Sequence, residues 1–516
     1  MKDNIFREYD IRGIVGDELP IEQTKDLGTA IFTYFLQQIP NLKQIVVAMD
    51  GRTHSPEIKN NIIDAATELG LDVLDIGVCP TPTFYFALFN SPASSGMIIT
   101  ASHNPKEYNG IKICLETKSV WGKQIQEIKD IYREIRSNLS IHPTPPNGSA
   151  WHSRRTEITA KAIADKQDKR ALLFPRSSRV MPQASYREIR TGIATSHDTL
   201  SAYISWLSNH FKHLKNSNIN AIIDCANGTA GTVFPRLIKS MGWNNVKLLF
   251  EEVDGTFPNH EADPTKPKNM ISVGKFLEKN KTCDLGIGLD GDCDRMSPMT
   301  KTGYLVPGDK LLALYSKKIL EKKPNATVVF DIKSSSALSQ AIESWGGKPH
   351  VAPSGHSIIK QHLREQNAVL AGELSCHFFF NDRYFGYDDG IYATLRLFEL
   401  LQESPESFDA MLEKLPKKIN SPEYRIACSE QEKKSIVDHV KSVFATRTDA
   451  SLLTIDGIKA ETSYGWGLIR ASNTQPVVCL RFESDSKDGL DRIQGDFTSA
   501  LTKYFDRKTL GKYFEN

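Results

Sequence analysis

The chain has 516 residues, of which 40% are hydrophobic and 24% are charged, and at about 150 residues per domain this length predicts three or four domains. Its 64 basic and 62 acidic residues almost balance, which argues against wholesale binding to nucleic acid or to a membrane surface. The first residues lack the apolar segment of a signal peptide, and no stretch approaches the roughly 20 apolar residues that span a bilayer. Eight cysteines are scattered without a Cys-x-x-Cys pair, which is typical of reduced thiols. We therefore expect a soluble, cytoplasmic, multidomain protein.

The first part of the chain alternates predicted strands with predicted helices. Residues 44–49 form a buried-strand pattern, an amphipathic helix follows over 55–69, and residues 71–76 form the next strand. A helix that begins at Pro80 leads to a short apolar strand that ends at Thr100. This alternation predicts βαβ units and a largely parallel sheet, in which functional residues lie at the carboxyl ends of the strands.

Ser102 follows the last of these strands directly, and Asn104-Pro105 then breaks the chain. A buried strand that ends in this way delivers a hydroxyl to the rim of a sheet, which makes Ser102 a candidate nucleophile or phosphoryl carrier. The alternative is a helix-capping or turn serine. This stretch alone does not distinguish a reactive serine from a structural one, so the choice depends on motifs elsewhere in the chain.

A basic segment interrupts the alternation after a charged helix near 124–135. Residues 151–190, within the segment 141–197, hold ten basic and four acidic residues, a net charge of +6. Such a stretch can bind nucleic acid or lipid, but this one has few aromatic residues and no groove-reading motif. We interpret it as a solvated, mobile insertion in a linker.

Two further α/β units and a different last domain follow the basic segment. Predicted strands at 221–225, 285–289 and 327–330 belong to the two units, and the three units of similar texture look like diverged repeats. In the last 100 residues the order changes to helix, paired strands and helix, which is a small α+β domain. Its elements are predicted at 430–444 (helix), 452–461, 467–470 and 477–482 (strands), with a final helix through Tyr504.

Three aspartates follow the strand at 285–289. Asp290, Asp292 and Asp294 alternate along an extended loop, so their carboxylates converge on one side and repel one another unless a cation lies between them. All-oxygen ligands favour a hard divalent ion, Mg²⁺ before Mn²⁺ or Ca²⁺. A solvated acidic turn is the alternative. The strand that aims this loop at a sheet edge favours the metal site.

A polar hairpin in the last domain gathers groups that suit a phosphate. Arg470, Ser472, Asn473 and Thr474 supply a guanidinium, two hydroxyls, an amide and the N–H groups of a turn. A phosphate dianion is held well by charge-assisted and neutral hydrogen bonds of this kind. Taken alone the indication is weak, because polar hairpin turns are common.

A second polar loop lies in the third unit. Glu373, Ser375 and His377 alternate on one side of an extended stretch, an arrangement that suits the hydroxyl groups of a sugar. Each of these residues taken singly is more often structural. The combination gains weight only beside the serine, aspartate and arginine loops.

Together these loops resemble those of the α-D-phosphohexomutases, in particular the bacterial phosphomannomutase/phosphoglucomutase type. Residues 100–105 resemble the phosphoserine loop of that family, 290–295 its metal loop, 372–377 its sugar loop and 470–476 its phosphate loop, in the family's order. The opening Phe-Arg-Glu-Tyr-Asp-Ile-Arg-Gly at 6–13 is similar to the same subgroup. Phosphoglucosamine mutases instead show a Gly-Thr-Asp-Gly opening and a Ser-Gly-Thr-Glu-Pro phosphate loop.

The resemblance implies an α/β fold of three related mixed-sheet α/β domains around a central cleft, plus a smaller C-terminal α+β domain. One motif would come from each domain. The boundaries that we expect are 1–140 (phosphoserine loop), 141–197 (basic linker insertion), 198–300 (metal loop), 301–416 (sugar loop) and 417–516 (phosphate loop).

The resemblance also implies an intramolecular phosphotransferase. A phosphoserine at Ser102 would give its phosphoryl group to a hexose phosphate, and the resulting hexose 1,6-bisphosphate would turn round and return the other phosphoryl group. The expected substrates are mannose 1-phosphate and mannose 6-phosphate, with mainly glucose phosphates as the alternative. The implied cofactors are one Mg²⁺ per chain, on Ser102 and the three aspartates, and hexose 1,6-bisphosphate as an activator. Partners would be small hexose phosphates, not nucleic acid or membrane, and the chain would be a monomer or homodimer.

Residue roles carry over position by position. The implied catalytic residues are Ser102, Lys112, His377 and Arg295, with Lys112 as the first and His377 as the second candidate for proton transfer. The implied substrate-binding residues are Tyr9, Arg12, His103, Lys333, His356, Glu373, Ser375, Arg470, Ser472, Asn473 and Thr474.

Two cysteines depart from the family pattern. Cys376 in the sugar loop and Cys293 in the metal loop stand where the family usually has glycine. A glycine there serves either a special backbone angle or space beside the ligand, and cysteine would cost either.

Two alternatives to a mutase remain. A phosphatase with a catalytic aspartate would place its acidic motif near the start of the chain, whereas this one lies in the middle. The chain could also be a mutase-like fold reduced to sugar-phosphate binding, or an interaction module that acts through its basic insertion. The presence of Ser102 and of all three aspartates argues against that reduced form.

Overall fold

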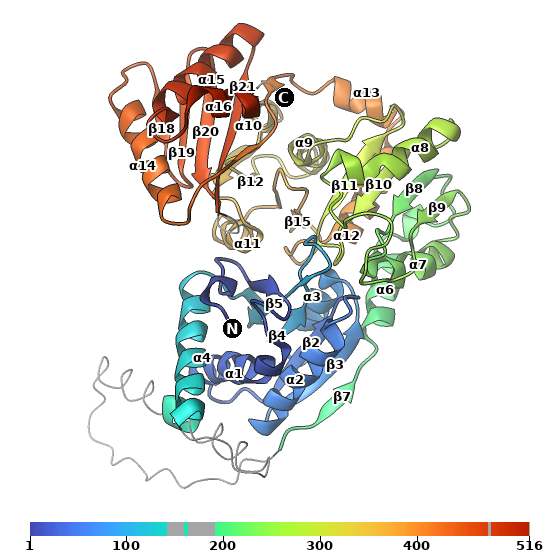
Figure 1. Cartoon of the computed structure of the whole chain (residues 1–516). Helices are drawn as coiled ribbons and strands as arrows, with labels where there is room; N and C mark the ends of the chain where they lie inside the picture. The colour runs from blue at the N-terminus through green and yellow to red at the C-terminus, as the bar shows by residue number, and fades with distance from the viewer. Residues whose placement is uncertain (142–158, 164–190, 473–475, 515–516) are drawn as a thin grey trace. The chain divides into compact units, whose positions relative to one another are not determined.

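The computed structural model describes the chain apart from residues 142–158, 164–190, 473–475 and 515–516 (Figure 1). The described residues divide into two compact units. Unit 1 comprises Met1–Phe276 and Ile287–Asp294, and unit 2 comprises Leu277–Gly286 and Arg295–Asn516. The predicted mobile insertion falls for the most part outside the described residues. None of the helices described is long and apolar enough to cross a membrane.

The first sheet has a parallel centre and an antiparallel edge. Its strand order is β1-β5-β4-β2-β3-β7, with β6 paired to β5. Strands β2, β3, β4 and β7 run parallel, as the alternation of the sequence predicts, whereas β5 is antiparallel to both β4 and β1. The strands are β1 (Ile11–Ile14), β2 (Gln44–Met49), β3 (Asp72–Val78), β4 (Gly96–Ile99), β5 (Tyr108–Leu115), β6 (Lys118–Ser119) and β7 (Ala194–Ser196).

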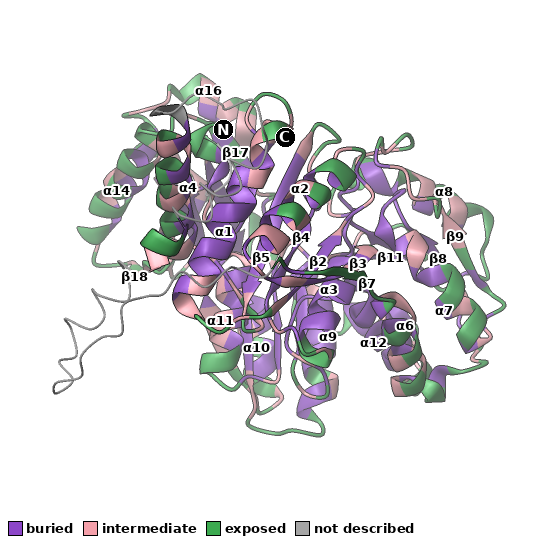
Figure 2. Ribbon diagram, turned by 90° about the horizontal axis from the view of Figure 1, so that it is seen from below, coloured by how far each residue is buried: buried purple, intermediate pink, exposed green. Residues whose placement is uncertain are grey.

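Helix α1 (Thr24–Gln38) is buried on most of its sides, between α2 (Ser55–Glu68) and α4 (Lys123–Ile141) (Figure 2). Helix α3 (Thr81–Asn90) contacts β2 and β4. Part of the predicted insertion touches α1, because Gln37 Nε2 donates to the carbonyl oxygen of Ala162 at 3.0 Å. Strand β7 also lies within the predicted insertion. The last residues of the predicted insertion therefore belong to the first sheet.

The second sheet has the order β11-β10-β8-β9. Asp198 caps helix α6 by accepting a hydrogen bond from the N–H of Ser201, and helix α7 ends at Gly242, whose φ of 66° closes the helix in the left-handed region. The elements are α6 (Thr199–His210), β8 (Ala221–Asp224), α7 (Phe234–Met241), β9 (Val246–Leu249), α8 (Ile271–Lys279), β10 (Leu285–Leu289) and β11 (Met296–Thr300).

The third sheet repeats the pattern with the order β13-β12-β14-β15. Strand β12 is parallel to β13 and β14, and β15 is antiparallel to β14. Its elements are α9 (Gly308–Leu320), β12 (Thr327–Asp331), α10 (Ser336–Ser344), β13 (Lys348–Ala352), α11 (His356–Glu365), β14 (Leu370–Gly372), β15 (Phe378–Phe380), α12 (Gly390–Glu403) and α13 (Phe408–Glu413).

The last domain is an antiparallel sheet with the order β16-β21-β20-β19-β18 and with β17 paired to β21. Helices α14 and α15 pack on this sheet, where Val440, Phe444 and Phe497 join its core. The fold class predicted from the sequence is thereby confirmed. The elements are β16 (Ile419–Asn420), β17 (Tyr424–Ala427), α14 (Glu432–Ala445), β18 (Ser451–Leu453), β19 (Ile458–Thr462), β20 (Gly465–Ala471), β21 (Val477–Ser484), α15 (Lys487–Leu501) and α16 (Arg507–Phe514).

The prediction of one strand over 452–461 is wrong, because the segment forms the hairpin of β18 and β19. Its turn contains Gly457, which has a φ of 75°. A side chain there would also collide with the backbone, since a Cβ would lie 2.2 Å from the carbonyl oxygen of Ile469. Only glycine satisfies both conditions.

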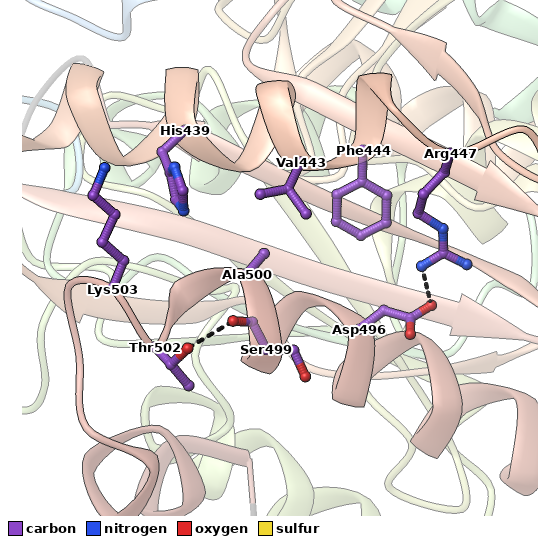
Figure 3. A pocket seen from close by; sticks show the side chains of 9 residues that line it. All are labelled: His439, Val443, Phe444, Arg447, Asp496, Ser499, Ala500, Thr502 and Lys503. Carbon is purple, nitrogen blue, oxygen red and sulfur yellow. Dashed lines mark hydrogen bonds and ion pairs between the residues drawn. The ribbon is translucent and has the colours of Figure 1, made fainter.

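A hollow with a volume of about 360 Å³ lies between α14 and α15 (Figure 3). Val443 of α14 and Ala500 of α15 line it from opposite sides, and an ion pair between Arg447 and Asp496 lies at one end. None of the residues that the sequence singles out lines it. The candidate site therefore has to be built from the loops at the strand ends.

Candidate functional site

Ser102 has an unusual backbone conformation, with a φ of 51° in the left-handed region. For a residue other than glycine this conformation costs on the order of 1 kcal/mol. The N–H of Ser102 donates to Oγ1 of Thr100 at 2.9 Å, and its Oγ donates to Oδ2 of Asp290 at 2.7 Å. Nδ1 of His103 lies 3.1 Å from the same Oγ. The strained turn therefore aims the serine hydroxyl at the metal loop.

The three aspartates of the metal loop are 0% exposed. Asp290, Asp292 and Asp294 each offer a carboxylate oxygen within 4.8 Å of the others. Nζ of Lys112 donates to Oδ2 of Asp292 at 2.7 Å and also pairs with Asp294. Thr81 adds a hydrogen bond to Oδ2 of Asp292 at 2.7 Å. Sequence-predicted residues that are far apart in the chain thus meet in one buried cluster.

This cluster fits a divalent cation. Lys112 brings one positive charge against the three carboxylates. Oδ1 of Asp292 is buried and has no hydrogen-bond partner among the described residues. A buried carboxylate oxygen without a partner is costly, and a hard cation with oxygen ligands would satisfy it. The residues present therefore suit the metal site that the sequence predicts.

Glycine is required where the metal loop approaches the serine loop. A Cβ on Gly291 would lie 2.8 Å from the carbonyl oxygen of Ser102. The carbonyl oxygen of Gly291 accepts a hydrogen bond from the N–H of Thr229 at 2.9 Å, which holds the loop from its other side. Cys293 follows with a φ of 61°. In the metal loop the family's glycine thus serves the backbone angle, and cysteine adopts that angle here.

The N-terminal site residues belong to the same unit. Nη1 of Arg12 donates to Oδ1 of Asn104 at 2.8 Å, which ties Arg12 to the serine loop, and Arg12 also pairs with Asp10. Tyr9 is half-buried in the preceding turn. The structure therefore brings Arg12 to the serine loop and places Tyr9 three residues before it.

The sugar loop is a tight turn in unit 2. The N–H of Glu373 donates to the carbonyl oxygen of His377, and the N–H of Cys376 donates to that of Glu373, both at 3.0 Å. Cys376 has a φ of 66°, so the family's glycine serves the backbone angle in this loop too. Oε1 of Glu373 accepts from the N–H of Gly355 at 2.8 Å. Burial raises the pKa of Glu373, and Ser375 is half-buried beside it.

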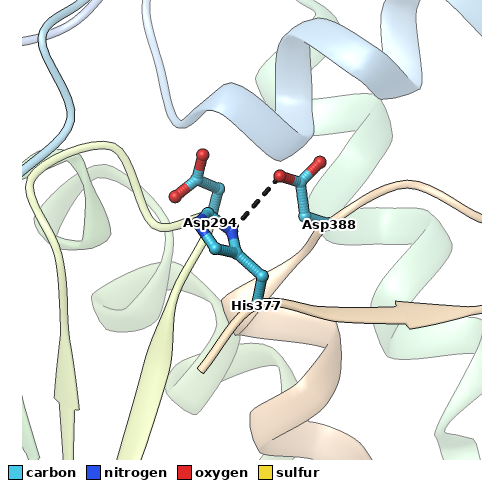
Figure 4. Close-up of side chains that lie close together, drawn as sticks. All are labelled: Asp294, His377 and Asp388. Carbon is cyan, nitrogen blue, oxygen red and sulfur yellow. Dashed lines mark ion pairs between the residues drawn. The ribbon is translucent and has the colours of Figure 1, made fainter. Parts of the chain in front are cut away.

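A buried aspartate lies beside two of the predicted imidazoles. Nδ1 of His377 lies 3.3 Å and Nδ1 of His356 3.5 Å from Oδ2 of Asp388 (Figure 4 shows the first pair). Nζ of Lys360 donates to Oδ1 of Asp388 at 2.9 Å. Burial by itself raises the pKa of Asp388, but Lys360 and then the two imidazoles outweigh it and hold that pKa well below its usual range. Asp388 is therefore a carboxylate, which only accepts hydrogen bonds.

Arg295 lies on the other side of the His377 ring. Its Nε donates to Nε2 of His377 at 3.0 Å. Because a guanidinium has no acceptor, Nε2 has to be the acceptor atom of this imidazole. With the Asp388 carboxylate at Nδ1, the proton of the neutral ring belongs on Nδ1. The pair favours the tautomer with its proton on Nδ1, in which the lone pair of Nε2 accepts from Arg295.

The phosphate loop is oriented by an aspartate on the β18–β19 turn. Nε of Arg470 donates to Oδ2 of Asp456 at 2.8 Å, and the same oxygen accepts from the N–H of Ser354 at 3.1 Å. Ser472 is 4% exposed, and its carbonyl oxygen accepts from Nζ of Lys433 at 2.8 Å. Asn473 and Thr474 lie outside the described residues.

Lys333 follows the carboxyl end of β12 and is, after Arg470, the second cation that the sequence predicts for phosphate binding. Its Nζ lies 3.3 Å from Oδ2 of Asp331 and 3.9 Å from Oε2 of Glu423. Burial lowers the pKa of Lys333, but these two carboxylates outweigh burial and raise it above its ordinary value. Lys333 therefore stays an ammonium, the form that can bind a phosphate.

Sequence reasoning missed Asp388 and Asp456. Asp388 follows His377 by 11 residues and Asp456 precedes Arg470 by 14, so no motif spacing joins either pair. A signal was present for Asp388, because two neighbouring aspartates, Asp388 and Asp389, precede the apolar stretch that forms α12. That pattern resembles a helix cap, and Asp389 does cap α12.

Comparisons with known proteins agree along the whole chain. Residues 3–139, 201–303 and 307–419 match the families described as phosphoglucomutase/phosphomannomutase, alpha/beta/alpha domains I, II and III, and residues 423–500 match the corresponding C-terminal domain. A phosphomannomutase/phosphoglucomutase of Pseudomonas syringae pv. tomato is 36% identical over 504 residues, which cover 98% of this chain and 96% of that protein. A phosphoglucomutase of Neisseria meningitidis serogroup B is 36% identical over 499 residues, 96% of each chain. A solved phosphoglucomutase/phosphomannomutase family protein from Burkholderia thailandensis superposes with a TM-score of 0.79 at 31% identity and covers 98% of each chain.

Four domains of this kind, with a serine hydroxyl on a buried carboxylate cluster, define the phosphohexomutase class. Within that class, the chain belongs to the phosphoglucomutase/phosphomannomutase family. The family membership expected from the four motifs is confirmed. The individual residue roles and the domain boundaries stay predictions.

The contact between the metal and serine loops predicts that Gly291→Ala is destabilising. The added methyl group would force the two backbones apart, and overpacking of this kind costs about 1–3 kcal/mol. Differential scanning calorimetry should therefore show a lower melting temperature for the transition that contains unit 1.

Gly495→Ala is the matched control for the same substitution. Gly495 is exposed on α15, and a Cβ there meets nothing within 4 Å. Alanine in place of glycine within a helix stabilises by about 1 kcal/mol, so this variant should melt at or above the native temperature. If Gly291→Ala melts as Gly495→Ala does, the close approach of the two loops is wrong.

Proposed function

We propose that the protein is a phosphohexomutase that interconverts hexose 1-phosphates and hexose 6-phosphates, with the mannose phosphates as its first substrates and the glucose phosphates as its second. The observation that carries the proposal is the hydrogen bond from Oγ of Ser102 to Asp290 at the rim of a buried cluster of three carboxylates. A hydroxyl in that place suits a phosphoryl carrier beside a divalent cation. The relatives that match nearly the whole chain carry names of the same activity.

Ser102 would exchange the phosphoryl group with the substrate. In the forward step the P–O bond to Ser102 breaks as a new P–O bond forms to the free sugar hydroxyl, and a hexose 1,6-bisphosphate results. After that intermediate has turned round, Ser102 takes back the other phosphoryl group. Mg²⁺, held by Asp290, Asp292 and Asp294, would neutralise charge on the phosphoryl group. The ammonium of Lys112 lies within the same cluster and can return a proton to the serine oxygen.

Groups of unit 2 would grip the substrate. Glu373 and Ser375 suit the sugar hydroxyls, because a carboxylate and a hydroxyl accept and donate hydrogen bonds from one loop. Arg470 and Lys333 suit the phosphate that is not reacting, since both are cations next to the carboxyl ends of strands. Free hexose 1,6-bisphosphate would act as an activator by phosphorylating Ser102.

We infer that His377 accepts the proton of the attacking hydroxyl. Lys112 lies between two carboxylates as an ammonium, which has no lone pair to accept a proton. Nε2 of His377 does have a lone pair, because Arg295 and Asp388 fix the ring in the tautomer that carries its proton on Nδ1. Because Nε of Arg295 donates to that lone pair, Arg295 has to turn away from Nε2 before the proton moves, and it can then bind the developing negative charge.

The first prediction of this proposal concerns Ser102. On incubation with glucose 1,6-bisphosphate or mannose 1,6-bisphosphate, the intact protein should gain the mass of one phosphoryl group, and Ser102→Ala should gain none. The same native preparation should turn over hexose 1-phosphates. If Ser102→Ala still gains the mass of a phosphoryl group, Ser102 is not the phosphoryl carrier. A native chain that forms no adduct and turns over neither sugar phosphate would be a binding protein of mutase-like fold.

The second prediction concerns the sugar. The site has to bind each substrate in two orientations, so it is expected to discriminate poorly between the two configurations of the 2-hydroxyl. We expect kcat/KM values for mannose 1-phosphate and glucose 1-phosphate within about tenfold of each other, which corresponds to about 1.4 kcal/mol. A preference of more than about 100-fold for glucose 1-phosphate would make the protein mainly a phosphoglucomutase.

The third prediction concerns the tautomer of His377. Asp388→Asn removes the negative charge next to Nδ1 of His377, so the basicity of Nε2 should fall and the ring should no longer be held in one tautomer. We expect kcat to fall by about 100-fold or more, as is typical for loss of a general base, while KM changes little. The ¹⁵N shifts of the His377 ring nitrogens report the tautomer directly.

Asp382→Asn is the matched control for Asp388→Asn. Asp382 is also a carboxylate with little exposure in unit 2, and it accepts two hydrogen bonds from Arg396 at 2.8 and 3.0 Å. Its replacement should cost stability but leave the ¹⁵N shifts of His377 as they are. If Asp388→Asn keeps both the native kcat and the native tautomer, His377 is not the base.

A further inference from the structure

Arg52 lies in the loop after β2, and its side chain is 0% exposed. A guanidinium has five N–H donors, and each of these five has an acceptor. Nε donates to Oδ2 of Asp50 at 3.1 Å. The two remaining nitrogens donate to four backbone carbonyl oxygens of the serine loop, those of Ser102 (2.9 Å), Asn104 (2.6 Å), Pro105 (2.7 Å) and Tyr108 (3.0 Å).

The surroundings of Arg52 hold the guanidinium in one place. Asp50, which accepts from Nε, is itself fixed by the hydroxyl of Ser55 at 2.7 Å and by the backbone N–H of Arg52 at 3.0 Å. The ring of Phe257 lies under the guanidinium, with its centroid 5.0 Å from Cζ. A charge buried this deeply is tolerated only when its hydrogen bonds are complete. All of the side-chain hydrogen bonds except the one to Asp50 go to one loop.

That loop needs such a partner. It leaves regular structure after β4, passes through the left-handed residue Ser102 and turns at Pro105 before β5 begins. Within the loop, the carbonyl of Pro105 accepts from the N–H of Tyr108 at 3.0 Å, and a buried carbonyl without a donor is costly. Arg52 donates with one rigid group to three carbonyls of this loop and to that of Tyr108, the first residue of β5. The fork geometry of arginine is what allows a single side chain to do so.

We propose that Arg52 is the positioning residue of the phosphoserine loop: by holding the carbonyl of Ser102 and three others, it keeps the serine hydroxyl directed at Asp290. This inference rests on the proposed function only in that Ser102 is the phosphoryl carrier. Arg52 touches neither the substrate nor the reacting atoms. It acts through the loop backbone, and its effect should appear in the transfer step rather than in substrate binding.

Lysine cannot replace arginine in this role. Its ammonium has three donors on a single atom, so at least two of the acceptors would lose their partner. A loop released in this way shifts, and a displacement of about 1 Å at the reacting atom can lower turnover by about 100-fold. We therefore expect Arg52→Lys to lower kcat by about 100-fold with KM changed less than about threefold, because the groups that grip the substrate belong to unit 2.

Two further readouts separate positioning from a general loss of structure. In the ³¹P spectrum of the phosphorylated protein, the phosphoserine signal of Arg52→Lys should shift or broaden relative to the native signal. Amide hydrogen exchange of residues 101–108 should become faster in the same variant while α1 and α2 keep their protection. Ile31→Ala is the control, since Ile31 belongs to α1 and is buried in the core of the same unit. It should destabilise the unit and leave kcat and the ³¹P signal unchanged.

Phe257→Leu is the second variant in case Arg52→Lys does not fold. It removes the ring beneath the guanidinium and keeps all five donors of Arg52, so it should lower kcat by several-fold and speed exchange at 101–108. The proposal is overturned if the loop exchanges as in the native protein, or if kcat falls no further than in Ile31→Ala. Faster loop exchange in a chain that has no mutase activity at all would leave the role of Arg52 standing and refute the proposed function instead.

Discussion

Mutual repulsion among three buried carboxylates is the constraint on which unit 1 depends. Asp290, Asp292 and Asp294 cannot remain buried as anions unless cations and hydrogen-bond donors surround them. Lys112 supplies one charge, and the hydroxyl of Ser102 supplies one of the hydrogen bonds. Because the serine is part of what stabilises the cluster, the position of its hydroxyl and the fit of the cluster to a divalent cation follow from the same electrostatic requirement.

Unit 2 meets the opposite requirement around a single carboxylate. Asp388 is buried among the ammonium of Lys360 and the imidazoles of His356 and His377, and these neighbours, Lys360 first, hold its pKa low. The permanent carboxylate then fixes how His377 carries its proton. The two units therefore differ in local charge: the aspartate cluster of unit 1 concentrates negative charge, and the surroundings of Asp388 in unit 2 gather neutral or cationic groups.

Continuous apolar runs were predicted well, as the agreement of 44–49 and 285–289 with β2 and β10 shows. The hairpin within 452–461 was not predicted. Its turn residues lie between two short apolar runs, and the sequence pattern indicated a single strand there. Helix α1 was not predicted, because it is buried on most sides and its buried positions include polar residues such as Asp26 and Thr33, which blur the helical period of the apolar ones. The αL backbone of Cys293 and Cys376 was suspected only from the family's glycines, since cysteine itself carries no turn signal.

The sequence by itself determined the family and the residues that we propose for the chemistry, because residues within one short loop are recognised by their spacing. The tertiary structure decided which side chains hold those groups in place. Arg52 meets the serine loop 50 to 56 residues away, and Asp388 and Asp456 meet their partners across sheet edges. Such contacts arise only when separate strands end at one edge, so no local pattern encodes them.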